Sequence, residues 1–157
     1  ADFSGPIDQL CASMRLQLDQ GKLVKLPIEG LHAELSLQDE TLQLIDLSAA
    51  MLKGNISAHG KLGFADDSMK YHLVLSLDRL DLNGLLQKLS AKSTDLIQGQ
   101  LNAQFSLTGN TSDWLGMTAS ADFRLSQLEI NSQKFSEIVG HLSYSYRNIH
   151  FLLDENG

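Results

Sequence analysis

Residues 117–125 read Met-Thr-Ala-Ser-Ala-Asp-Phe-Arg-Leu, with an apolar residue at every second position. Successive side chains of a β-strand point to opposite faces, so this period of two predicts a strand with one apolar and one polar face. The same alternation recurs in residues 14–18, 31–37, 71–77 and 101–107. The sequence therefore predicts an all-β fold whose sheet carries one long apolar face.

Polar clusters separate the alternating runs at the spacing of β-hairpins. They lie at 19–21, 38–40, 65–68, 131–132 and 147–148, and each contains Asp or Asn, which favour turns. Connections this short join antiparallel neighbours, because parallel strands need a long crossover. We therefore expect a twisted antiparallel sheet in which each strand pairs with its neighbour in the chain.

Two segments interrupt the alternation. The leucines between 82 and 89 would share one face of a short helix over 82–90, capped by Asp81 or Asn83. A single helical turn is expected near 111–116. At 157 residues the chain predicts one domain over 1–157, built as one unit or as two sub-units with a seam near 90–95.

Composition excludes several classes of protein. A formal net charge of -7 without a cluster of Lys or Arg excludes a nucleic-acid partner, which requires a basic surface. Cys11 is the only cysteine and cannot form an internal disulfide. The sequence contains no run of about 18 apolar residues, so it predicts no membrane-spanning helix. The chain begins with Ala1 rather than Met, and we interpret it as a piece of a longer protein.

The residues that commonly carry chemistry do not form a recognisable site. All five histidines fall on the polar phase of their predicted strands, without the spacing of metal ligands. The paired acids Asp39-Glu40 and Asp66-Asp67 fall in predicted turns, where no desolvated pocket would separate their pKa values. Neither a Gly-x-Ser-x-Gly nor a Gly-x-Gly-x-x-Gly motif is present. We therefore expect no enzyme activity, no cofactor and no metal site.

The apolar phase consists mainly of Leu and Ala, whereas the cores of β-sandwiches are usually filled with Val, Ile and aromatic residues. One interpretation is an ordinary sandwich with an unusual core. The other is a sheet curled around a space that its own side chains do not fill, leaving room for acyl chains. The residues predicted to line that space are Leu73, Leu75, Leu101, Ala103, Phe105, Ala119, Ala121 and Phe123.

Three blocks of the sequence resemble the repeat region of the AsmA/TamB superfamily of bacterial envelope proteins. Residues 47–62 read Leu-Ser-Ala-Ala-Met-Leu-Lys-Gly-Asn-Ile-Ser-Ala-His-Gly-Lys-Leu, and residues 75–86 and 98–109 follow in the order of that family. The resemblance covers about residues 30 to 130. It departs from the family at Lys53-Gly54, where a pair of glycines is usual, and we expect the family's N-terminal membrane anchor to lie outside these residues. Residues 134–146 are more similar to TamB than to AsmA.

This resemblance implies a taco-shaped or U-shaped β-groove with an apolar interior. It also implies a periplasmic location, within a protein that is anchored in the inner membrane of a diderm bacterium. The groove would carry the acyl chains of phospholipid between the inner and outer membranes.

A TamB-like translocation and assembly factor is the alternative. It would bind strands of outer-membrane proteins by β-augmentation, together with an outer-membrane barrel assembly protein. The candidate edges are 15–19 and 149–153, because the chain ends of a meander become the edges of its sheet. Such edges also predict that the chain self-associates edge to edge.

Overall fold

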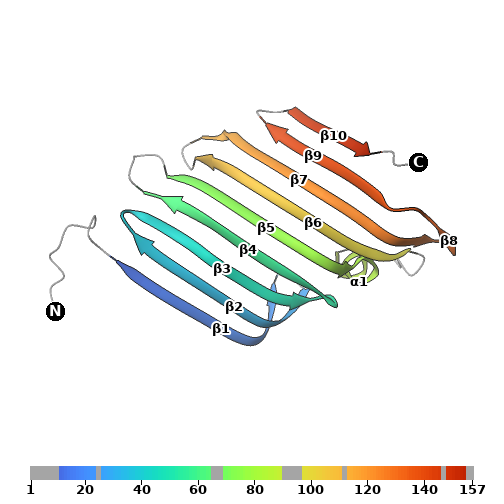
Figure 1. The fold of residues 1–157 in the computed structure, drawn as a ribbon, viewed down its shortest axis with the longest axis horizontal. Helices are drawn as coiled ribbons and strands as arrows, with labels where there is room; N and C mark the ends of the chain where they lie inside the picture. Colours follow the sequence, from blue (N-terminus) through green and yellow to red (C-terminus); the bar gives the residue numbers. More distant parts are fainter. Residues whose placement is uncertain are drawn as a thin grey trace.

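The computed structural model describes residues 11–23, 26–64, 69–89, 97–110, 113–145 and 148–154. They form one helix and ten strands, which follow one another across the molecule in chain order (Figure 1). The elements are β1 (Ala12–Leu23), β2 (Leu26–Gln38), β3 (Thr41–Met51), β4 (Gly54–Gly63), β5 (Lys70–Asp81), α1 (Leu82–Leu89), β6 (Ile97–Asn110), β7 (Asp113–Ile130), β8 (Gln133–Lys134), β9 (Ile138–Ser145) and β10 (Asn148–Asp154).

All the strands belong to a single sheet in the order β1-β2-β3-β4-β5-β6-β7-β9-β10, with β8 paired to β7. Every pairing is antiparallel. The predicted all-β antiparallel fold is therefore confirmed. The predicted edges are confirmed as well, since β1 and β10 lie at the two ends of the strand order.

Two-residue turns with positive φ join several of the strands. The pairs Asp39-Glu40, Leu52-Lys53 and Asn131-Ser132 all lie in the left-handed region, the conformation of a type I′ hairpin turn. The turns predicted at 38–40 and 131–132 are thus confirmed, whereas the turn at 52–53 was not predicted because Leu and Lys are not typical turn residues.

The turn predicted at 19–21 is wrong. Strand β1 continues through it to Leu23, because Gln20 and Gly21 pair with Glu29 and Ile28 of β2. The predicted turn at 65–68 lies outside the described residues. So does residue 147 of the last predicted turn, while Asn148 already belongs to β10.

The helix predicted over 82–90 is confirmed as α1, and Asp81 accepts hydrogen bonds from the backbone N–H groups of Asn83 and Gly84 at its first turn. The second predicted helix is wrong. Residues 113–116 belong to β7, where Asp113 pairs with Asn110 and closes the β6–β7 hairpin, so no helical turn fits between the strands. Residues 111–112 and the predicted seam near 90–95 lie outside the described residues.

Asp81 also forms an ion pair with Lys53, with 2.8 Å between Nζ and Oδ2. The hydrogen bond from Lys53 is the main cause that lowers the pKa of Asp81 below its ordinary value of 3.8. We expect replacement of Asp81 with alanine to lower the free energy of unfolding at pH 7 by about 1 kcal/mol, the usual effect of losing a helix cap.

The effect of this substitution should depend on pH. Because the pKa in the folded state is depressed, charged Asp81 stabilises the fold above 3.8, and this contribution is lost as the pH falls through the lower folded value. Urea unfolding at pH 7 and at about pH 2.5 should show the wild type and the variant converging in acid. The exposed Asp78 gives a control, Asp78→Ala, with little expected effect; an equal loss from Asp81→Ala at both pH values would contradict the prediction.

Among the described strands, β-bulges of one extra residue shift the phase of the alternation in β2, β3, β5 and β7. At each bulge two residues of one strand oppose a single residue of its neighbour. The apolar residues therefore step by three instead of two and remain on the same face of the sheet. The four steps are Ile28 to Leu31, Leu44 to Leu47, Leu77 to Leu80 and Leu125 to Leu128.

The packed core occupies only the end of the sheet next to α1. Its centre is Leu80, which has no exposed surface, and Leu85 of α1 packs against this cluster. The end of the β1–β2 hairpin, which carries Leu26 and Ile28, turns away from the direction of the remaining strands (Figure 1) and contributes to the same core. Away from this end, the apolar face lies open.

Candidate functional site

Directly paired residues of neighbouring strands lie on the same face of a sheet. One row of such pairs, here called the middle row, crosses nine strands from edge to edge and contains only apolar residues. The middle row is Leu16, Ala33, Leu47, Ala58, Leu75, Phe105, Ala121, Leu142 and Phe151.

Two further rows flank the middle row on the same face. The turn row, on the side of the turn at 39–40, is Met14, Leu35, Leu44, Gly60, Leu73, Leu107, Ala119, Tyr144 and Ile149. The helix row, on the side of α1, is Ala49, Ile56, Leu77, Ala103, Phe123, Gly140 and Leu153. Together the three rows form what we call the apolar face.

The structure brings all eight predicted lining residues together on this face, over β5, β6 and β7. Three belong to the middle row, two to the turn row and two to the helix row, and Leu101 pairs with Leu80 and Leu125 beyond the helix row. Leu73 and Phe105 are 39% and 38% exposed, whereas Ala103 and Ala121 are buried between larger neighbours. Contact of these eight residues with lipid stays a prediction.

Gly60 creates a hollow in the turn row, because it has no side chain to fill the space beside Leu44 and Leu73. A Cβ atom at Gly60 would lie 2.5 Å from the carbonyl oxygen of His72, so no other residue fits there without a shift of the backbone. The hollow has a volume of about 300 Å³ and an almost wholly apolar lining. Its walls include Leu35, Leu44, Leu62, Leu73 and Leu107.

A second glycine of the apolar face is covered instead. The ring of Phe123 lies over Gly140, as aromatic side chains often do beside glycine in a sheet. This ring stacks on Phe151 of β10, with 6.0 Å between the ring centroids. The face is therefore smooth near β10 and hollowed over β3 to β6.

The prediction missed the part of the apolar face that lies on β2 to β4 and on β9 and β10. Leu35, Leu44 and Leu62 of the hollow, and Leu142 of the middle row, follow the same alternation as the predicted residues. In β3 the bulge hides the pattern, since Leu44 and Leu47 are three residues apart. A prediction that allowed one three-residue spacing in each strand, as at a β-bulge, would have extended the lining to these strands.

The opposite face of the sheet is mainly polar, with Val74, Val139 and Leu152 as exceptions, and holds all five histidines. His141 Nδ1 lies 2.7 Å from Asp122 Oδ1, and His72 Nδ1 lies 3.0 Å from the Thr108 hydroxyl. No group of three or more His, Cys, Asp or Glu side chains is arranged to hold a metal ion within the described ranges. Of the helices described, none is long and apolar enough to span a membrane.

The structure is thus an open antiparallel sheet with a continuous apolar face. Residues 6–132 match the AsmA family, and the chain therefore belongs to the AsmA family. Its membership indicates an envelope-associated protein. Comparison with curated proteins and with solved structures finds no significant match.

Proposed function

We propose that this chain is a non-enzymatic segment of a periplasm-spanning, inner-membrane-anchored envelope protein, and that its apolar face carries the acyl chains of phospholipid between the inner and outer membranes. The observation that supports this most is the middle row, which crosses nine strands without one polar side chain. An acyl chain lying across the strands along such a row meets apolar surface along its whole path.

The energetics of the face suit transport better than tight binding. Each CH₂ group buried against it contributes about 0.8 kcal/mol, so half of an acyl chain is held by several kcal/mol. The hydrophobic effect has no preferred direction, so a chain can slide along the row without breaking a specific bond. The hollow over Gly60 widens the path at one point. Lipid head groups would remain in water at the rim.

Photocrosslinking in cells tests this function. A crosslinking residue at Leu75 or Phe105 of the middle row is expected to capture phospholipid, because both side chains lie on the apolar face. The matched controls are Ser76 and Gln104, which pair with each other on the polar face of the same two strands. Capture of lipid only from these two positions would reverse the assignment of the faces.

A second candidate function is the binding of outer-membrane protein strands along a sheet edge, as a TamB-like assembly factor would do. It is favoured by the state of the edge strands: every residue of β10 is exposed, and so is every residue from Ala12 to Gln20 of β1. The outer side of an edge strand presents unpaired backbone N–H and C=O groups, which template another strand.

We expect the same edges to pair two copies of this chain in solution. Native mass spectrometry should show dimers or higher oligomers, and Ile149→Pro, within β10, should reduce them because proline removes a backbone donor. Ile45→Pro is the reference for a proline that disrupts the sheet itself, because Ile45 lies in the interior strand β3 and its side chain is exposed. A strictly monomeric chain would contradict edge pairing, and crosslinks from β10 to outer-membrane protein precursors, with none to lipid, would favour the second function.

A further inference from the structure

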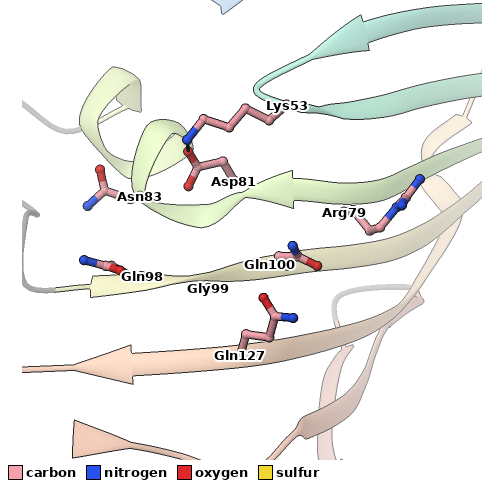
Figure 2. A pocket seen from close by; sticks show the side chains of 8 residues that line it. All are labelled: Lys53, Arg79, Asp81, Asn83, Gln98, Gly99, Gln100 and Gln127. Carbon is pink, nitrogen blue, oxygen red and sulfur yellow. Dashed lines mark ion pairs between the residues drawn. The ribbon is translucent and has the colours of Figure 1, made fainter. Parts of the chain in front are cut away.

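A depression lined by polar side chains lies on the polar face of the sheet, beside the start of α1 (Figure 2). It has a volume of about 730 Å³, within the range of about 300–1,000 Å³ that is usual for small-molecule sites. Gln100 pairs with Asp81, one residue along from the Leu80–Leu101 pair of the apolar side. Because side chains alternate along a strand, the depression faces away from the apolar face.

Two of the bulges described above supply side chains to this depression. Arg79 and Gln127 lie in the left-handed region, with φ angles of 53° and 52°, a conformation that residues other than glycine seldom adopt. Bulges redirect the side chains of a strand, and strained residues gather at functional sites. Both residues line the same depression although they come from β5 and β7, with β6 between them (Figure 2).

The lining holds two cations, Lys53 and Arg79, and one carboxylate, Asp81, together with carboxamide side chains. Lys53 is paired with Asp81 at 2.8 Å, and Arg79 Nε lies 3.2 Å from Asp78 Oδ2, so each cation has an acidic partner. The carboxamides of Gln98 and Gln100 on β6 and of Gln127 on β7 lie to one side of these cations (Figure 2). Within the part of the chain that the structure describes, these three carboxamides make no side-chain hydrogen bond.

From this arrangement we infer that the depression binds a neutral saccharide chain. A sugar hydroxyl both donates and accepts hydrogen bonds, and a carboxamide offers an N–H₂ donor and a carbonyl acceptor to match it. An anionic ligand would have to displace Asp81 from Lys53 or Asp78 from Arg79. An apolar ligand would leave the carboxamides unsatisfied. Because the site faces away from the apolar face, it takes a free glycan rather than the sugar head group of a lipid held there.

Isothermal titration calorimetry of the chain with tetra-N-acetylchitotetraose, and in parallel with maltotetraose, tests this inference. Saturable binding of at least one of them is expected. The double variant Gln100→Ala/Gln127→Gly should weaken it about tenfold or more, because two hydrogen-bonding groups are lost. Glycine at 127 accepts the positive φ angle, so this variant keeps the fold, as circular dichroism can verify. Gln104→Ala, on the same strand and face but outside the depression, should leave the affinity unchanged.

Three results would overturn the inference: no saturable binding of either tetrasaccharide, equal weakening by Gln104→Ala, or binding of inorganic phosphate in place of sugar. None of these results affects the lipid crosslinking from Phe105 on the other face. The saccharide site and the proposed lipid groove therefore stand or fall separately.

Discussion

Replacing Leu80 with alanine is expected to lower the free energy of unfolding by about 3–5 kcal/mol, the cost of opening a cavity in a packed core. Leu80 has no exposed surface and lies at the centre of the cluster formed by the β1–β2 end, β3, β4 and α1. Urea unfolding followed by circular dichroism measures the loss. Since this cluster is the packed core of the sheet, the loss is a large part of the stability of a domain.

Leu73→Ala is the matched control, because Leu73 lies on the same strand and on the same apolar face. Its side chain is 39% exposed, so its truncation should cost about 1 kcal/mol or less. Equal losses at the two positions would mean that the apolar face is sealed along its whole length. That result would favour the ordinary sandwich over the open groove.

Replacing Phe105 with aspartate is expected to abolish lipid binding while the chain still folds. Phe105 lies in the middle row and is 38% exposed, so in the lipid-free chain the carboxylate reaches water. An acyl chain bound over it would bury an unpaired charge, which costs several kcal/mol and lowers the bound fraction more than tenfold. Native mass spectrometry of the chain with added phospholipid measures the bound lipid directly.

Gln104→Asp is the control for this substitution, because it adds the same charge to the polar face of the same strand. It should retain lipid binding, and far-ultraviolet circular dichroism should be the same for both variants. If Phe105→Asp unfolds the chain, Phe105 belongs to a sealed core. If it folds and still binds lipid, acyl chains lie elsewhere and the proposed groove is wrong.

Much of the fold could be predicted because period-two alternation reports directly on a two-faced sheet. The residues from Met117 to Leu125 show this, and so do the eight predicted lining residues, which all lie on one face. The helix at 82–89 was predictable from the spacing of its leucines and the cap at Asp81. These patterns are local in the sequence. They predict the fold well here because most strands pair with their neighbours in the chain.

The failures have local physical causes as well. The helical turn predicted near 111–116 relied on Asp113, a residue common in turns and helix caps. Asp113 instead pairs with Asn110 and begins strand β7. Gly21 suggested a turn, but the small residue serves close packing, since a Cβ there would lie 2.8 Å from the side chain of Leu18. The polar depression could not be predicted, because it depends on two bulges in separate strands that only the folded register brings together.

The pairing of each strand with its neighbours in the chain has a consequence for how the protein is made. Most contacts between elements join strands that are consecutive in the sequence. As the chain emerges from its N-terminal end into the compartment where it folds, each new strand therefore finds its partner already present, and it does not wait for a distant segment to close a long loop. The sheet can grow hairpin by hairpin from β1 onward, and of the described strands only β9 passes over the strand before it, β8, to pair with β7.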